Sequence, residues 1–189
     1  MSDNEISRKY LDITIPQIER VTSITPFVWE AVTPSILPNK PLKFFRTKPT
    51  LGTTESKSLS STEMAVWYSH FTLWKHIKEN GINSWIFEHD VDLSNVNLLL
   101  PYVNDIVTLK CKGCLEAYYL TPFGAKKLYD AAIGMSIYYQ VDGFVYNLVE
   151  SRESFKKIHY SPKLPISQLK MYGTTIDHQP SSATYSDQV

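Results

Sequence analysis

Residues 60–90 read SSTEMAVWYSHFTLWKHIKENGINSWIFEHD, and this stretch decides the fold. Ser60 and Glu63 fit the S-x-x-E pattern of a capping box, which marks the start of a helix. Apolar and aromatic residues then recur at helical spacing as far as Asn80-Gly81, a dipeptide that typically ends a helix. The pattern therefore predicts a long helix over residues 61–80 with one wide apolar face.

Short apolar runs follow this helix and predict buried strands. They cover residues 84–88, 105–109 and 115–120. Thr121 is an expected N-cap with Pro122 at the first helical position, so a second long helix should begin there and end at Gly134. Because strands alternate with helices, we expect the α/β class, with a mostly parallel sheet flanked by helices.

The segments before and after this core are less regular. Residues 5–20 predict a short helix or turn that stops near Pro16, and residues 20–32 predict one or two short strands. Residues 34–60 hold four prolines and many hydroxyl side chains, which is typical of a long surface loop. Residues 138–148 predict a further helical or mixed segment.

Length and charge limit the possible classes of protein. A chain of 189 residues predicts one domain, which we expect over residues 1–170, with a polar, loosely ordered tail at 171–189. Lys plus Arg and Asp plus Glu both number 19, and this zero net charge argues against nucleic acid as a partner. No apolar run has the length of a transmembrane helix and no signal peptide is visible, so we expect a cytoplasmic protein.

Two smaller motifs can be explained without a functional role. Cys111-Lys-Gly-Cys114 has no second pair to complete a zinc site, and it leads into a strand rather than a redox helix. Two cysteines also make no disulfide framework. The basic run over residues 40–48 contains Phe44 and Phe45, and could contact a phosphate-bearing acceptor, DNA included. The alternative is a solvated loop anchored by its two aromatic rings.

Acidic residues gather where the predicted strand over 84–88 ends. Glu88, His89, Asp90 and Asp92 follow its apolar residues directly. In open α/β sheets ligands bind beyond the carboxyl ends of strands, and carboxylates there are suited to a hard cation. An acid-x-acid pair of this kind can bind a divalent ion that in turn binds a diphosphate. The alternative is a polar turn with solvated acids, in which His89 points to the other side.

Several motifs then follow one another in a recognisable order. They are Glu63, Ser69-His70, Leu73-Trp74, Trp85-Ile-Phe-Glu-His-Asp90, Glu116-Ala-Tyr-Tyr-Leu-Thr121, Gly124-Ala-Lys-Lys-Leu128 and Val141-Asp142. In this order they resemble the family 25 glycosyltransferases, which include lipopolysaccharide and collagen sugar transferases. The resemblance is best over residues 60–145.

The resemblance implies the A-type glycosyltransferase fold, which is Rossmann-like. It also implies a nucleotide-sugar donor, usually a UDP-hexose, a divalent metal such as manganese or magnesium, and inverting transfer to a glycan or another hydroxyl-bearing acceptor. Metal ligands would be Glu88 and Asp90, supported by Asp92. The donor pocket would be shaped by Glu63, Ser69 and His70. Asp142 would act as the base that takes the acceptor proton.

Structural explanations stand beside these roles. His70 lies two helical turns after Glu63, so it could be a core histidine hydrogen-bonded to that carboxylate. Asp142 could be a helix N-cap.

Two departures from the family pattern favour another interpretation. The middle acid of the family's Glu-Asp-Asp triplet is His89 here, and the apolar strand that opens the family is not visible before residues 7–9. The alternative function is therefore a catalytically silent relative that binds a saccharide or a protein partner. A transferase acting on modified DNA bases is a further alternative, against which the zero net charge argues.

Overall fold

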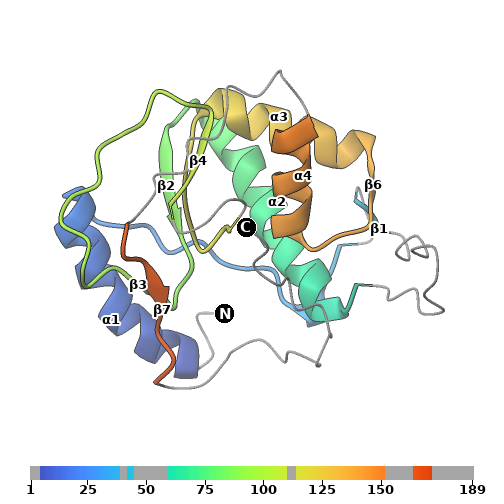
Figure 1. Cartoon of the computed structure of the whole chain (residues 1–189). Coiled ribbons are helices and arrows are strands. Elements are labelled where there is room, and N and C mark those ends of the chain that lie inside the picture. The colour runs from blue at the N-terminus through green and yellow to red at the C-terminus, as the bar shows by residue number, and fades with distance from the viewer. Residues whose placement is uncertain (1–4, 39–41, 45–58, 110–113, 152–163, 172–189) are drawn as a thin grey trace, which may run out of the picture.

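The computed structural model describes residues 5–38, 42–44, 59–109, 114–151 and 164–171 (Figure 1). Its central sheet consists of β2 (Ser84–Phe87), β4 (Ile106–Thr108) and β5 (Ala117–Leu120), in the order β2-β5-β4. Helices cover both faces of this sheet. The mixture of helices and strands agrees with the class expected from the sequence.

Pairing within the central sheet is antiparallel, because β5 pairs antiparallel with β2 on one side and with β4 on the other. The expectation of a mostly parallel sheet is wrong for these strands. Residues 109–116 join β4 to β5, and they are too few for the crossover of about a dozen residues that parallel neighbours require. A small parallel sheet does form where β1 (Lys43–Phe44) pairs with β6 (Ser136–Ile137).

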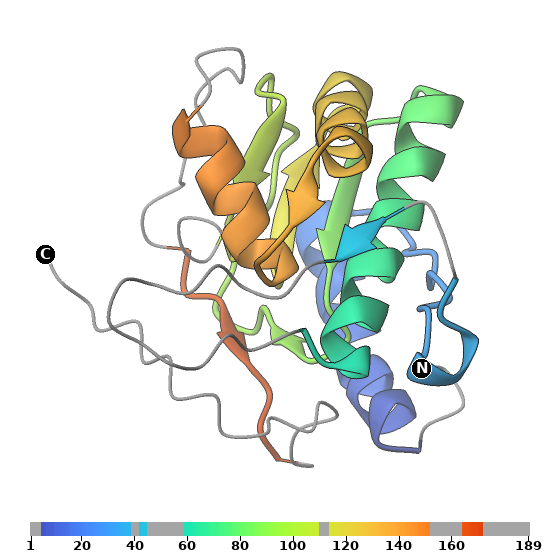
Figure 2. The ribbon, with the colours of Figure 1, turned by 90° about the vertical axis from the view of Figure 1, so that its right-hand side faces the viewer.

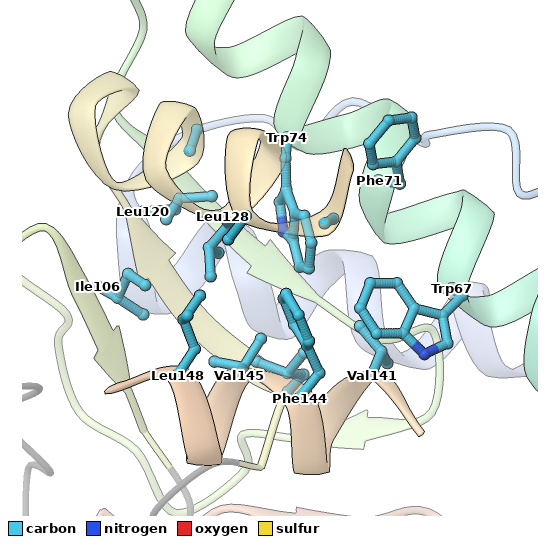
Figure 3. Close-up of a cluster of buried hydrophobic side chains, with 14 of the residues drawn as sticks. Trp67, Phe71, Trp74, Ile106, Leu120, Leu128, Val141, Phe144, Val145 and Leu148 are labelled. Atoms are coloured by element: carbon cyan, nitrogen blue, oxygen red, sulfur yellow. The ribbon is translucent and has the colours of Figure 1, made fainter. Parts of the chain in front are cut away.

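One face of the sheet is covered by α2 (Ser61–Asn80), α3 (Pro122–Gly134) and α4 (Val141–Ser151). Figure 3 shows how aromatic side chains of α2 meet apolar side chains of α4 there. The ring centres of Trp67 and Phe144 are 4.7 Å apart, in an edge-to-face contact. Ile86, Tyr118 and Leu120 of the sheet point into the same cluster.

The opposite face is covered by α1 (Glu5–Thr22) and by residues 91–99. In Figure 1, α1 lies to the left of the sheet and α2 to α4 lie to its right; Figure 2 shows the same elements from the side. β3 (Val91–Asp92) pairs antiparallel with β7 (Ser167–Gln168) beside α1. Trp85 and Phe87 pack on this side, as alternation along β2 requires.

Helix α1 is longer than the sequence indicated, because it continues through Pro16 to Thr22. The strands expected over residues 20–32 are therefore wrong, and residues 25–32 form neither helix nor strand. Proline removes one helical hydrogen bond. Tertiary contacts outweigh that loss: Arg20 in the last turn donates hydrogen bonds to the carbonyl oxygens of Leu93 and Val96, at 2.6 and 2.7 Å.

The predicted ends of α2 and α3 are confirmed. The Ser60 hydroxyl accepts a hydrogen bond from the Glu63 N–H, and the Glu63 carboxylate accepts one from the Ser60 N–H, which together form a capping box. Gly81 ends α2 with a φ of 65°, in the left-handed region that favours glycine. Thr121 caps α3, accepting from the N–H of Gly124.

The described part of residues 34–60 holds the short 3-10 helix η1 (Pro34–Ile36) and β1. Phe44 packs edge-on against Trp67 and Tyr68, as an anchoring aromatic would. Residues 39–41 and 45–58 of the expected loop, Cys111 and residues 172–189 lie outside the described residues. Cys114 is disulfide-bonded, which the sequence analysis did not predict.

None of the helices within the described ranges is both long and apolar enough to cross a membrane.

Candidate functional site

A cavity of about 960 Å³ lies between α1 and α2, along β2. Its walls are mainly apolar, and the two helices contribute Leu11, Ile15, Ile18, Val66, Leu73 and Ile77. β2 is an edge strand of the central sheet, and all of its residues line the cavity. A concave, mostly apolar site with a few polar groups is the usual form of a small-molecule pocket.

The acidic residues Glu88 and Asp90 lie in the turn that directly follows β2. The N–H of Val91 donates to the carbonyl oxygen of Glu88 at 3.2 Å, which makes residues 88–91 a tight turn. Glu88 and Asp90 both line the cavity. Asp90 Oδ1 is buried and has no hydrogen-bond partner in the described part of the chain. A buried carboxylate oxygen without a partner is costly, which favours a site that a bound group completes.

His70 lines the same cavity from α2. Its Nδ1 lies 2.9 Å from the Tyr118 hydroxyl, which also accepts a hydrogen bond from the Trp74 indole at 3.2 Å. His70 is only 8% exposed, and burial lowers its pKa to about 4, so the imidazole is neutral at neutral pH. The core position is confirmed, but the expected bond to Glu63 is wrong, because Tyr118 takes that place.

Ser69 lines the cavity, whereas Glu63 does not. Glu63 is occupied by the capping box and also accepts a hydrogen bond from the Gln140 side chain. The Ser69 hydroxyl donates to the carbonyl oxygen of Ala65 and accepts from the N–H of Val32, at 2.9 Å in both cases. In this structure both side chains fix the main chain around α2.

Asp92 is separated from the other two acids. Its carboxylate accepts hydrogen bonds from the N–H of Ser94 at 3.0 Å and from the Ser167 hydroxyl at 3.2 Å. The bond from the Ser94 N–H is the main reason that the pKa of Asp92 is lowered. Asp92 does not line the cavity, and its bond with Ser167 joins β3 to β7.

Asp142 lies in the first turn of α4, where a carboxylate interacts favourably with the helix dipole. Its side chain is exposed and does not line the cavity. Its charge does influence Tyr118, the hydrogen-bond partner of His70. Burial, and then the charges of Glu88 and Asp142, raise the pKa of the Tyr118 hydroxyl.

His89 turns toward α1. Its ring meets that of Tyr10 edge-on, with 5.8 Å between the ring centres, and burial lowers its pKa. The Thr14 hydroxyl of α1 donates to the His89 carbonyl oxygen at 2.8 Å, which ties the turn to the helix.

Glu88 and Asp90 carry the kind of side chain that binds a divalent metal. No three His, Cys, Asp or Glu side chains of the described residues are grouped so as to hold a metal ion by themselves. Magnesium-type sites often use one or two carboxylates, with substrate phosphates and water completing the shell. The two acids, with the unpartnered oxygen of Asp90, fit a site of that kind.

Sequence reasoning missed Tyr118, Trp74 and the contribution of α1 to the cavity. Tyr118 lies 48 positions after His70 in the chain, and the packing of α2 on the sheet brings them together. Alternation within Ala117-Tyr-Tyr-Leu120 was the available signal, because it places Tyr118 and Leu120 on the face that α2 covers.

Comparison of the chain with protein-family models, with curated proteins and with solved structures gives no match.

Proposed function

We propose that this protein is a glycosyltransferase of the A-type, Rossmann-like kind that moves a hexose from a nucleotide sugar, with UDP as the expected nucleotide, to an acceptor hydroxyl. The observation that carries the proposal is the position of Glu88 and Asp90. Both follow an apolar strand, and both line one cavity together with His70. The order of motifs that resembles family 25 glycosyltransferases supports the same conclusion.

Glu88 and Asp90 would hold a manganese or magnesium ion. When bound, the ion neutralises the diphosphate that leaves the sugar. The apolar walls from α1 and α2 surround these half-buried carboxylates with groups of low polarity, which strengthens their electrostatic interactions. Lys170 supplies the one Lys or Arg side chain among the described residues that line the cavity. A diphosphate bound there would therefore depend on the metal for most of its charge compensation.

Asp142 remains the proposed base. An inverting displacement needs the base and the leaving diphosphate on opposite faces of the sugar. The acids at the end of β2 line the cavity, whereas Asp142 lies outside it at the start of α4. Its charge acts on Tyr118, whose hydroxyl contacts His70, so it is near the same part of the site.

The test is UDP binding by calorimetry with and without manganese, and hexose transfer from a panel of UDP-sugars. Asp90→Asn should abolish the effect of manganese on UDP affinity and lower turnover by about 100-fold or more. Asp92→Asn is the matched control, because its carboxylate binds Ser94 and Ser167 instead of lining the cavity. Absence of UDP binding by the wild-type protein in both conditions would exclude the proposal.

A second candidate function is saccharide binding without catalysis. Phe27, Trp29 and Trp85 line the cavity, and aromatic faces suit sugar rings. The Trp29 indole N–H has no hydrogen-bond partner among the described residues, so it could donate to a sugar hydroxyl. A protein that binds oligosaccharides but neither UDP nor manganese would have this function.

A further inference from the structure

We propose that His70 recognises the transferred hexose: its Nε2–H donates a hydrogen bond to a neutral oxygen of the sugar, and Tyr118 is the positioning residue that fixes this N–H. The inference rests on the proposed function, because the sugar is part of the nucleotide donor. It states which nitrogen of His70 contacts the ligand, which tautomer the ring adopts, and which group of the ligand accepts the hydrogen bond.

The first step is the tautomer. An indole N–H only donates, so the Tyr118 oxygen accepts from Trp74. Among the described residues, the Tyr118 hydroxyl contacts just Trp74 and His70. The hydroxyl proton must therefore go to His70 Nδ1, since any other arrangement leaves a buried hydroxyl without an acceptor. Nδ1 is then unprotonated, and Nε2 carries the proton.

The second step is the availability of that proton. Within the described part of the chain, Nε2 has no hydrogen-bond partner. His70 lines the cavity, so a ligand there can accept from Nε2–H. A neutral N–H suits an uncharged hydroxyl or ring oxygen, whereas phosphates are usually bound by Arg, Lys or a metal ion.

The third step is the position along the cavity. Ile86 pairs with Tyr118 across β2 and β5, so Glu88, two residues further on, faces the same side of the sheet. The charge of Glu88 acts on the Tyr118 hydroxyl, which is the group that His70 contacts. Through Tyr118, His70 is therefore on the side of the sheet that Glu88 faces, and Glu88 is one of the two carboxylates proposed to hold the metal ion that binds the diphosphate. In a UDP-sugar, the hexose is joined directly to that diphosphate.

The experiment compares UDP with a UDP-hexose. Manganese is present, and the probe is whichever of UDP-glucose and UDP-galactose the wild-type protein binds more tightly. His70→Leu should weaken UDP-hexose binding about tenfold, the value of one neutral hydrogen bond, and change UDP binding less than twofold. His70→Gln keeps a neutral N–H donor and should recover most of the loss. Lys75→Gln, on the same helix but exposed and outside the cavity, is the control and should bind both ligands normally.

Tyr118→Phe is the second variant, in case His70→Leu does not fold. It should weaken UDP-hexose binding about threefold, because His70 loses the group that selects its tautomer. Nitrogen NMR of the free wild-type protein should find the proton of His70 on Nε2, and in Tyr118→Phe a mixture of both tautomers.

Each outcome decides one question. Equal weakening of UDP and UDP-hexose by His70→Leu, or no weakening of either, overturns the sugar contact. If NMR of the ligand-free wild-type protein finds the proton of His70 on Nδ1, the proposed tautomer is wrong. If the wild-type protein binds neither ligand, the proposed function fails and the hexose assignment fails with it, while the NMR result still decides the tautomer.

Discussion

A Cβ atom on Gly124 would lie 2.1 Å from the main-chain carbonyl oxygen of Asp105. The same oxygen accepts a hydrogen bond from the N–H of Thr121 at 3.0 Å, so it is fixed at the start of α3. No side chain fits at that distance. Glycine is therefore required by close packing at this position of the helix, although alanine is the better helix former.

Gly124→Ala should lower the free energy of unfolding by about 2 kcal/mol, because the clash with Asp105 exceeds the gain in helix propensity. The matched control is Gly134→Ala, in the last turn of the same helix, where an added Cβ meets no atom within 4 Å. That change should leave stability unchanged or raise it slightly. Thermal unfolding of the two variants measures the difference, and equal melting temperatures would refute the packing argument.

Two adjacent lysines of α3 provide a second test. Lys127 Nζ lies 2.9 Å from Asp105 Oδ2, and the two side chains are 19% and 9% exposed. Lys126 pairs with Asp130, and these side chains are 62% and 50% exposed. Lys127→Met should destabilise the protein by about 2–3 kcal/mol, since it leaves a largely buried carboxylate without its cation.

Lys126→Met should cost less than about 0.5 kcal/mol, because exposed pairs contribute little. Urea unfolding of both variants compares the pairs under the same conditions. If Lys126→Met lost as much stability as Lys127→Met, burial would not determine how strongly these ion pairs stabilise the protein.

Local sequence signals located the ends of α2 and α3 correctly, since each end depends on groups three or four residues apart. Ser60 with Glu63, and Thr121 with Gly124, form hydrogen bonds that any isolated helix start would form. Gly81 acts through its own backbone conformation. None of these signals needs the rest of the fold.

Errors arose where distant contacts decide the structure. Pro16 indicated a helix end, but α1 is held by the bonds of Arg20 to carbonyl oxygens more than 70 residues away in the sequence. The direction of β5 depends on the length of the connection after β4, which the strand pattern itself does not contain. Glu63 stands at the spacing of a partner for His70, yet the capping box and the Gln140 side chain occupy it.

The capping box separates a structural role of Glu63 from a role in donor binding. Ser60→Ala should lower stability by about 1 kcal/mol, the usual effect of losing an N-cap. Glu63→Gln keeps an oxygen that can accept from the Ser60 N–H, so its stability should stay close to that of the wild type. UDP binding by calorimetry should be normal in both variants. A marked loss of UDP affinity in Glu63→Gln would return Glu63 to the donor site.

The last prediction concerns acid stability. Burial lowers the pKa of His70 to about 4 from an ordinary value of 6.5. As the pH falls, the unfolded chain therefore binds this proton before the folded chain does. Above about pH 6.5, protonation of His70 has no effect on stability. As the pH falls from about 6.5 to about 4, the free energy of unfolding decreases progressively. Burial also lowers the pKa of His89, which contributes with the same sign.

Urea unfolding at about pH 7 and about pH 5 measures this effect. The wild-type protein should lose about 2 kcal/mol more than His70→Gln between these two pH values, since the variant has no group to protonate at this position. His76→Gln is the control, because it removes a histidine from the same helix and leaves His70 in place. It should lose as much stability as the wild type. If His70→Gln shows the same loss on acidification as the wild-type protein, His70 is not a buried neutral histidine, and the acid sensitivity arises at His89 or the carboxylates.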